Sequence, residues 1–380
     1  MPLAPRRWVL CFLAGFPSPG LAQRYWDQAY APLAYYSTVD GLWLAGYARV
    51  YSPVIGWEAR PEPYLAWAQL GAGASTEGSY TVELEAQAPA WWQGWRAALT
   101  LAAERRNRLG YYGLGNATLY RADSAGSARP YFYRVSRTVF AVRATVQRRI
   151  AGPLRALAGA GVSRTDYRGL PGETAFERDL ARGTLDPDQI PFTDGVVRAG
   201  LVVDTRDHES DPHAGVLLEA LYAAGRGYER VTGAARLYAH PVERWILAAR
   251  VAGERLSGDP PLAAQSVLES SGDPVAAVGG YRSLRGYPEG RFTGSGKLLA
   301  GVEARYALLL VSPYELKLFG FYDAGRVFGP GERFRLTVDD LHAGAGAGAA
   351  ARLGRNTVFV LGAGFTGEGW ELLFEGGWSY

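Results

Sequence analysis

Residues 279–287 read Gly-Gly-Tyr-Arg-Ser-Leu-Arg-Gly-Tyr, and this stretch decides how the rest of the chain is interpreted. It lies in a glycine-rich interruption, roughly residues 258–296, that has neither the period of a strand nor that of a helix. Connections this long are usually either disordered or functional. Because the interruption leads directly into a segment with a clear strand pattern, we interpret it as a functional loop.

Two segments that follow the loop alternate between apolar and polar side chains. In residues 297–308 every second side chain is apolar, and Glu303 and Arg305 belong to the other set. Residues 314–327 repeat the pattern, with Asp323 in the other set. A period of two predicts strands with one face toward an apolar medium and the other toward a polar one. Glu303 and Asp323 then share the polar side, where an arginine from the preceding loop can pair with them through its planar guanidinium.

Three short motifs occur along the chain. The loop contains Leu284-Arg285-Gly286-Tyr287, and the second strand after it contains Phe321-Tyr322-Asp323-Ala324-Gly325. Earlier in the chain, Val203-Asp204-Thr205-Arg206-Asp207 is followed by Pro212 and Gly215. In this order the motifs resemble those of the BamA/TamA-like outer-membrane insertases, also called bacterial surface antigens. The resemblance covers roughly residues 40–380.

The resemblance implies a site and a fold. In that family the loop arginine contacts the strand aspartate from inside a sixteen-stranded barrel. Arg285 is therefore expected to meet Asp323 in the lumen, with Glu303 as its neighbour and Leu284, Gly286, Tyr287, Phe321 and Gly325 around it. A strand end and its turn are expected at Asp204, Arg206, Asp207, Pro212 and Gly215.

The composition fits a barrel. The chain of 380 residues has 49 Gly, 23 Tyr and 11 Trp but one Met and one Cys, which suits many short strands with aromatic girdles. Beyond the N-terminus it has no apolar run of the length, about 18 residues, that a transmembrane helix needs. Because backbone polar groups in lipid must all be satisfied, a spanning sheet has to close. We therefore predict an all-β protein, a sixteen-stranded antiparallel transmembrane β-barrel with a loop inserted into its lumen.

The chain divides into three predicted parts. Residues 1–22, with Arg6 and Arg7 before an apolar region and small residues at the end, read as a signal peptide. Residues 23–40 are expected to be a short periplasmic segment, too short for the accessory (POTRA) domains of the family, and residues 41–380 the barrel. Cleavage removes the single cysteine and lowers the formal charge from +3 to +1, which argues against disulfides and against a nucleic-acid partner. The predicted location is the bacterial outer membrane.

The expected strands number sixteen, and the strand at 131–137 has the weakest pattern. If both chain ends lie in the periplasm, this division puts the long 107–130 connection on the periplasmic side, where turns are usually short. Either the fifth strand is misplaced or that turn is unusual. The same division also makes 41–52 and 370–380 the first and last strands, which meet at the seam that closes the barrel. Their packing there is expected to be weak because of Gly41, Gly46, Gly376 and Gly377. The sixteen ranges are 41–52, 62–73, 79–88, 95–106, 131–137, 138–150, 154–165, 195–206, 214–226, 230–241, 243–257, 297–308, 314–327, 341–353, 356–367 and 370–380.

The last residues resemble the C-terminal signal by which outer-membrane barrels are themselves assembled. In an extended strand Phe374, Trp378 and Tyr380 would share one face, together with Leu372 and Gly376. The cellular assembly machinery is thus an expected partner. The alternative is an ordinary amphipathic edge strand.

Several patterns that suggest other chemistry are weak. Residues 204–213 contain carboxylates and histidines but no rigid spacing for a metal, and a charged turn explains them better. Residues 290–297 lack the spacing of a phosphate loop, and 111–116 lack the third glycine of a dinucleotide site. No nucleophile elbow occurs. We expect neither an enzyme nor a cofactor or metal site.

Two functions remain open. The leading one is assembly or translocation of unfolded outer-membrane or secreted client proteins at the outer membrane, with membrane lipids as surroundings. The alternative is a plugged pore or a structural surface antigen without such activity. The expected lack of accessory domains favours the alternative, whereas the loop motif favours the first.

Overall fold

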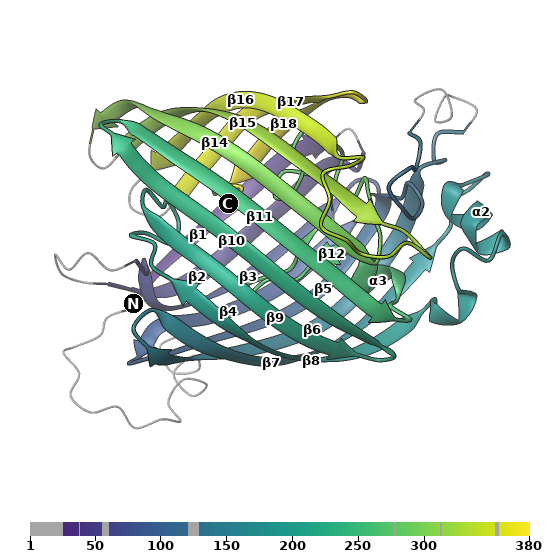
Figure 1. Ribbon diagram of the computed structural model, residues 1–380, viewed down its shortest axis with the longest axis horizontal. Coiled ribbons are helices and arrows are strands. Elements are labelled where there is room, and N and C mark those ends of the chain that lie inside the picture. Colours follow the sequence, from purple (N-terminus) through teal and green to yellow (C-terminus); the bar gives the residue numbers. More distant parts are fainter. Residues whose placement is uncertain are drawn as a thin grey trace, which may run out of the picture.

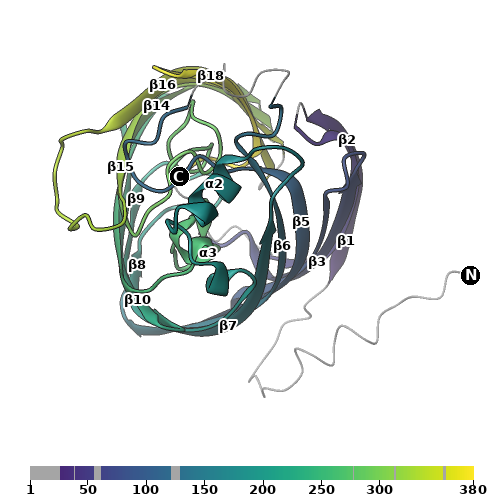
Figure 2. The ribbon, with the colours of Figure 1, turned by 90° about the vertical axis from the view of Figure 1, so that its right-hand side faces the viewer.

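The computed structural model of the protein describes residues 26–37, 39–54, 61–120, 129–276, 278–311, 314–353 and 357–380. Sixteen antiparallel strands form one sheet, and every strand pairs with its neighbours along the chain. The sheet curls into a barrel around a lumen that contains loop segments (Figures 1 and 2). No helix among the described residues is both long and apolar enough to cross a membrane. The predicted fold class is confirmed.

The elements follow one another in chain order. The wall consists of β1 (Asp27–Ser37), β2 (Gly41–Pro53), β3 (Tyr64–Ser75), β4 (Tyr80–Trp92), β5 (Trp95–Gly110), β6 (Arg134–Ala151), β7 (Leu154–Arg168), β8 (Phe192–Asp204), β9 (Gly215–Gly225), β10 (Tyr228–Val242), β11 (Trp245–Gly258), β14 (Gly296–Val311), β15 (Tyr314–Phe328), β16 (His342–Leu353), β17 (Thr357–Thr366) and β18 (Gly369–Gly376). The connections hold α2 (Ala175–Ala181), η2 (Pro187–Gln189), α3 (Leu262–Gln265), β12 (Val267–Leu268) and β13 (Val275–Ala276).

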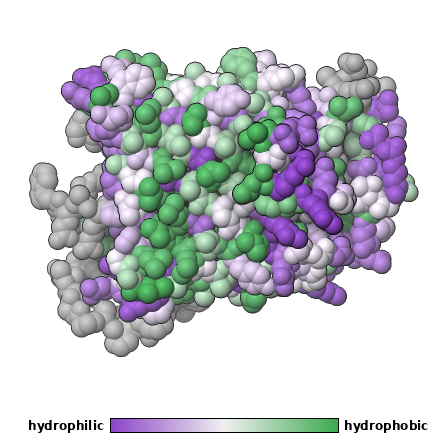
Figure 3. All heavy atoms as spheres, viewed as in Figure 1, coloured by the Kyte–Doolittle hydropathy of each residue, from purple (hydrophilic) through white to green (hydrophobic). Residues whose placement is uncertain are grey.

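The predicted alternation separates an apolar outside from a polar inside. On β14, Val302 is exposed on the outer surface whereas Glu303 and Arg305 are buried in the lumen. On β15, Tyr322 is exposed outside and Asp323 is buried inside. Figure 3 shows apolar residues gathered across the middle of one face of the barrel. Exposed apolar side chains of this kind occur around the wall, for example Leu70, Val82, Phe140, Val162, Val197, Val251, Phe359 and Phe365.

The first strand of the barrel was missed in the sequence. Residues 27–37, expected to belong to a short periplasmic segment, form β1 and pair with β2 over the whole length of β1. Its side chains do not alternate cleanly, and Pro32 interrupts the pattern. Proline is tolerated on an edge strand because such a strand has ladder positions without a partner. The end strands of the sheet are therefore β1 and β18, and the predicted assignment of 41–52 to the seam is wrong. Residues 1–22 lie outside the described residues, so the signal peptide stays a prediction.

The predicted strands 131–137 and 138–150 are one strand. Residues 131–133 form a turn, and β6 runs from Arg134 to Ala151 without a break. A barrel strand needs only about 9–11 residues to cross a bilayer, so a pattern of this length suggested two strands. Adding β1 and merging the two predicted strands into β6 keeps the total at sixteen. Each connection between β1 and β6 then lies at the opposite end of the barrel from the one predicted.

With this strand count the four longest connections lie at one end of the barrel. These four, residues 111–133, 169–191, 259–295 and 329–341, join strands at what we call the loop end, which is on the right in Figure 1; the ten-residue connection 205–214 is at the other end. The opposite end, called the turn end, has two-residue connections such as 93–94 and 152–153. The predicted fifth strand was therefore misplaced: five strands precede the 107–130 connection rather than four, which puts it at the end opposite the start of β1.

An aromatic cluster lies at the loop end. Tyr111, Phe132, Tyr167 and Phe176 are buried together, and the Tyr111 hydroxyl donates to Asp179 at 2.8 Å. Phe176 belongs to α2, whose first turn is capped by Thr174, because its hydroxyl oxygen accepts the Glu177 N–H at 3.1 Å. The cluster joins the 111–133 and 169–191 connections above the strands.

Candidate functional site

The long connection 259–295 folds into the lumen, as predicted. It carries α3 and the small β12–β13 hairpin before it reaches the Leu284–Tyr287 motif. Leu284 is fully buried and packs with Val278, Phe292 and the wall residues Leu299 and Val327. The loop therefore has an apolar anchor of its own inside an otherwise polar lumen.

Arg285 joins this loop to two carboxylates of the wall. The residue is buried, and its side chain is 1% exposed. The Nε and Nη2 groups donate to the two carboxylate oxygens of Asp323 at 2.6 and 3.1 Å, and Nη1 donates to Glu303. The Arg285 backbone N–H also donates to Asp323, at 3.3 Å. The fork-to-fork geometry with Asp323 is the strongest form of an arginine–carboxylate contact.

Two further arginines complete the cluster. Arg250 on β11 lies 3.2 Å from Asp323, and Nε of Arg305 on β14 donates to Glu303 at 2.7 Å. Arg250 also donates to the backbone carbonyls of Arg282 and Ser283, so it holds the loop backbone as well as the carboxylate. Three guanidinium groups thus share two carboxylates away from solvent, where an ion pair is stable only if its polar groups are satisfied.

Aromatic rings cover the remaining faces of the cluster. The Arg285 guanidinium lies 3.7 Å from the centre of the Phe321 ring and 5.2 Å from that of Tyr380. Contacts at these distances stabilise a desolvated cation through the ring quadrupole. Phe321, predicted only as part of a motif, therefore has a direct role in holding Arg285.

Glycines on the wall let the loop backbone approach. Gly286 has a φ of +93°, which favours glycine, and a Cβ on Gly364 of β17 would lie 2.7 Å from the Gly286 nitrogen. A Cβ on Gly344 of β16 would collide with the Arg285 carbonyl oxygen. Gly325 is similar, because its Cβ would lie 3.2 Å from Val278 of the loop. Gly344 and Gly364 were missed, although glycines at every second position of 344–348 and 362–364 were a visible signal.

Tyr287 completes the motif at the loop end of the lumen. Its ring is buried and makes edge contacts with Phe292 at 5.2 Å and with His342 at 6.0 Å. Nearby, Arg291 donates to both carboxylate oxygens of Glu368 and to the Thr118 carbonyl. The loop is thus attached to the wall at two levels, by Arg285 in the lumen and by Arg291 next to the 111–133 connection.

The end of the chain corrects the predicted C-terminal strand. β18 stops at Gly376, and Gly377, with a φ of +96°, turns residues 378–380 into the lumen. Phe374 stays on the outer surface, whereas Trp378 and Tyr380 do not share its face. The positive φ of Gly377 breaks the extended backbone on which the shared face depended. A role of these residues in assembling the barrel stays a prediction.

The inserted tail contacts the arginine cluster and the loop. The Trp378 Nε1–H donates to Asp211 at 2.7 Å, and its ring lies 3.8 Å from the Arg305 guanidinium. The Ser379 hydroxyl donates to the Tyr281 carbonyl at 2.7 Å, and the Tyr281 hydroxyl donates to the Gly377 carbonyl at 2.9 Å. Arg250 stacks on the Tyr380 ring at 4.3 Å. The tail therefore connects the last strand to the pinned loop.

Replacing Trp378 with alanine is expected to destabilise the folded barrel by about 2–3 kcal/mol, since a half-buried indole loses its packing and Asp211 loses a donor. The temperature at which the compact band is lost in SDS gel electrophoresis measures the change. Trp370 on β18, eight residues earlier, is the matched control, because it is 64% exposed on the outer surface and contacts no part of the lumen loop among its described interactions. Equal shifts for both variants would show that the tail contributes nothing specific.

The predicted strand-end turn is present between β8 and β9. Arg206 donates from Nε and Nη2 to the two Asp204 oxygens, each at 3.0 Å. Asp207 accepts the backbone N–H groups of His213 and Ala214. Gly215 has a φ of +103°, and a Cβ there would collide with the Thr205 carbonyl. The Pro212 carbonyl accepts a long hydrogen bond from Arg305 at 3.5 Å, so the turn reaches the arginine cluster.

The same turn contains the residues that suggested a metal cluster. Ligand atoms of Asp211, His213 and Glu315 lie within 4.8 Å of one another. The Lys317 ammonium lies among them, 3.0 Å from His213 Nε2 and 3.1 Å from Glu315, and it pairs with Asp211. Burial acts to raise the pKa of Asp211, but the His213 hydrogen bond and the Lys317 charge outweigh it and lower that pKa. This arrangement supports the charged-turn interpretation.

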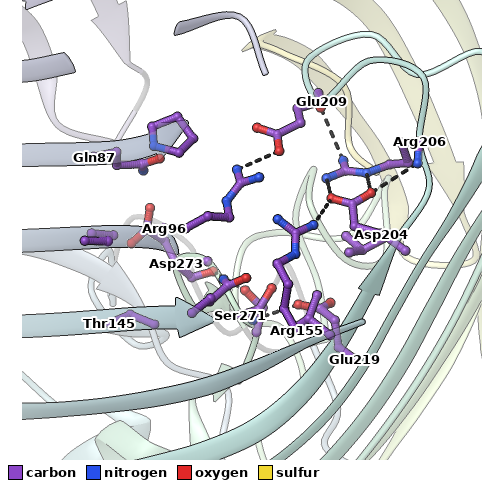
Figure 4. Close-up of a pocket in the computed structure, with 18 of the residues that line it drawn as sticks. Gln87, Arg96, Thr145, Arg155, Asp204, Arg206, Glu209, Glu219, Ser271 and Asp273 are labelled. Atoms are coloured by element: carbon purple, nitrogen blue, oxygen red, sulfur yellow. Dashed lines mark hydrogen bonds and ion pairs between the residues drawn. The ribbon is translucent and has the colours of Figure 1, made fainter. Parts of the chain in front are cut away.

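A charged cavity of about 200 Å³ lies in the lumen beside the loop (Figure 4). Arg96 pairs with Glu209, and Arg155 and Arg206 converge on Asp204. The tip of the loop contributes Ser271, whose N–H donates to Glu219 at 2.7 Å. The loop therefore fills part of the lumen and leaves a polar space between its tip and the strands β4–β10.

The Omp85 superfamily domain matches residues 67–356, most of the barrel. The chain belongs to the Omp85 superfamily. A crystal structure of BamA from Haemophilus ducreyi that lacks POTRA domains 1–3 has a TM-score of 0.57 and 13% identity, covering 93% of this chain and 69% of that one. CdiB from Escherichia coli (TM-score 0.57, 10% identity) and CdiB from Acinetobacter baumannii (TM-score 0.53, 11% identity) each cover 94% of this chain and 60% of their own.

These likenesses establish the fold, and the family indicates a β-barrel of the bacterial outer membrane related to BamA and CdiB. The chain spans 60% of the length of the CdiB chains. No curated protein matches the sequence.

Proposed function

We propose that this protein assists the insertion or translocation of unfolded client proteins at the outer membrane. Membership of the Omp85 superfamily supports this proposal. The observation that carries it is the link from the pinned loop to the edge of the sheet, because the tail that follows β18 stacks on Arg250 and contacts Tyr281 of the loop. The state of the loop and the state of the last strand are thereby connected.

The edges of the sheet suit strand addition. β1 and β18 stand at the two ends of the strand order; between described residues, β1 pairs with β2 and β18 with β17. β18 has eight residues and β1 has eleven, including Pro32. Edge strands present unpaired N–H and C=O groups that can pair with another chain. A client strand would gain backbone hydrogen bonds there while its apolar side chains enter lipid.

No bond has to be made or broken for this function. A strand that enters the membrane must satisfy its backbone polar groups, and an edge strand supplies the partners during entry. The free energy then comes from the client's own folding. The pinned loop would keep the lumen polar and closed while the edge strands are in use.

The test is an insertion assay in liposomes. Liposomes that contain the purified protein are expected to speed the folding of a small unfolded outer-membrane barrel, relative to empty liposomes and to liposomes with an unrelated closed porin. The fraction of heat-resistant client over time is the measurement. Acceleration no greater than that of the porin would reject the proposal and favour the plugged pore, which the charged cavity beside the loop would otherwise support.

A further inference from the structure

The β15–β16 connection, residues 329–341, folds back over the outside of the barrel. Figure 2 shows it outside the ring of strands, and Figure 1 shows it lying in front of the wall near the loop end. Its Phe334 ring lies 5.2 Å from that of Phe328. A Cβ added to Gly296 would lie 3.1 Å from Phe334, and one added to Gly253 would lie 3.7 Å from it. Two wall glycines thus make room for this ring.

The wall beneath the loop confirms this position. Arg326 lies on the outward-facing set of β15, the same set as Tyr322, yet it is 3% exposed. The loop covers it, because Arg326 donates to the Asp339 carbonyl at 2.8 Å and pairs with Asp340 at 3.7 Å. Asn116 donates to the Asp340 carbonyl at 2.8 Å. The loop is therefore held against the wall at both Phe334 and Asp340.

Between these two attachment points the chain carries apolar residues outward. Leu336 is 84% exposed and Val338 is 82% exposed, the highest values among the large apolar side chains of the described residues. Thr337 lies between them; its hydroxyl donates to Asp339 at 2.7 Å and accepts the Asp339 backbone N–H at 3.1 Å, which orders the backbone beside the two apolar residues. An ordered loop that presents two apolar side chains to water is unfavourable, so the exposure points to a covering partner.

We propose that residues 329–341 form an anchor that inserts Leu336 and Val338 into the outer layer of the membrane, at the boundary of headgroups and acyl chains. The covering partner is lipid because the loop continues the lipid-facing surface. Gly253 and Leu298 are paired and face outward under Phe334. Two residues further from the loop end on these antiparallel strands lie Val251 and Ala300, and Val251 is exposed on the apolar belt. A segment at this level meets the membrane boundary, where apolar side chains are buried about 5–10 Å deep.

The test places a single fluorescent probe on the loop. With Cys11, the only cysteine, replaced by serine, Leu336→Cys and Val338→Cys are each labelled with an environment-sensitive dye and reconstituted in liposomes. The dye at each position is expected to emit at a shorter wavelength than the same dye free in buffer. Its fluorescence should be quenched more by lipids that carry a spin label near the headgroup than by lipids labelled near the end of the acyl chain.

Two matched positions calibrate the result. Thr184→Cys, beside α2 at the loop end, is exposed to water and should show neither shift nor quenching. Val251→Cys lies on the apolar belt and should be quenched most by the deeper label. The loss of the compact gel band would identify a variant that fails to fold. If one of the two loop variants fails in this way, the probe at the other loop position provides the test. A probe on the loop that behaves like Thr184 overturns the proposal, and so does a shift that depends on the ratio of protein to lipid, which would indicate a second copy of the chain.

Discussion

Alanine at position 285 is expected to lower the stability of the barrel by about 3 kcal/mol and to raise its ion conductance in planar bilayers. Removing one partner of a buried ion pair costs about 3–5 kcal/mol. We expect the lower end of this range because each carboxylate retains one ion pair, Asp323 with Arg250 at 3.2 Å and Glu303 with Arg305 at 2.7 Å. Without Arg285 the loop loses its ion pairs with Glu303 of β14 and Asp323 of β15, and the lumen that it fills becomes more open to ions.

The matched control for this variant is Arg282→Ala, three residues earlier in the same loop, whose side chain is exposed to the cavity. Its conductance and thermal midpoint should stay close to those of the parent protein. If Arg285→Ala and Arg282→Ala behave alike, the guanidinium at 285 does not hold the loop.

Valine at position 364 is expected to expel the loop while leaving both charged partners in place. A Cβ there would lie 2.7 Å from the Gly286 nitrogen and 2.8 Å from its Cα, so the wall and the loop backbone cannot keep their positions. Overpacking of this kind costs typically 1–3 kcal/mol, and the high end is expected because the clashing atoms are backbone. The measured signs are a higher conductance and protease cleavage within 259–295.

Gly71→Val controls for the added β-branched side chain. Gly71 lies on β3, and a Cβ there meets nothing within 4 Å. This variant should keep the parent conductance and resist protease. A Gly364→Val protein with an intact, protected loop would show that the loop does not lie against β17.

The wall and its central contact could be predicted from the sequence because both depend on local rules. The alternation in 297–308 and 314–327 assigns Glu303 and Asp323 to the lumen without knowledge of the remaining strands. Arg285 could then be matched to them by charge and by the motif. The same reasoning could not find Arg250, because its contact with Asp323 depends on the register of β11 against β14.

The errors arose where the backbone leaves the regular strand. β1 has no clean alternation, because Pro32 interrupts it and most of its side chains are exposed rather than buried on one face. The tail was expected to extend β18, but one positive φ at Gly377 sends Trp378 and Tyr380 into the lumen. This turn depends on the contacts that Trp378 and Tyr380 make in the lumen, with Asp211, Arg305 and Arg250. These partners are distant in sequence, so a local pattern cannot predict the turn.

The side of the 107–130 connection could not be assigned from the sequence for a related reason. The error in 23–40 removed one strand, and the division of β6 added one in its place, so the total was right while every connection between them changed sides. A count of strands is therefore a weaker check than the lengths of successive connections. Short turns at one end and long loops at the other would have exposed the error.

A double-mutant cycle tests most directly whether the loop is held in the lumen by Arg285 and the wall carboxylates. The thermal midpoints of Arg285→Ala, Asp323→Ala and the double variant are measured against the parent. Groups in one buried ion network are expected to show a coupling of about 0.5–3 kcal/mol, so the double variant should be less destabilised than the sum of the single ones by that amount. Additive losses would contradict the pairing of Arg285 with Asp323.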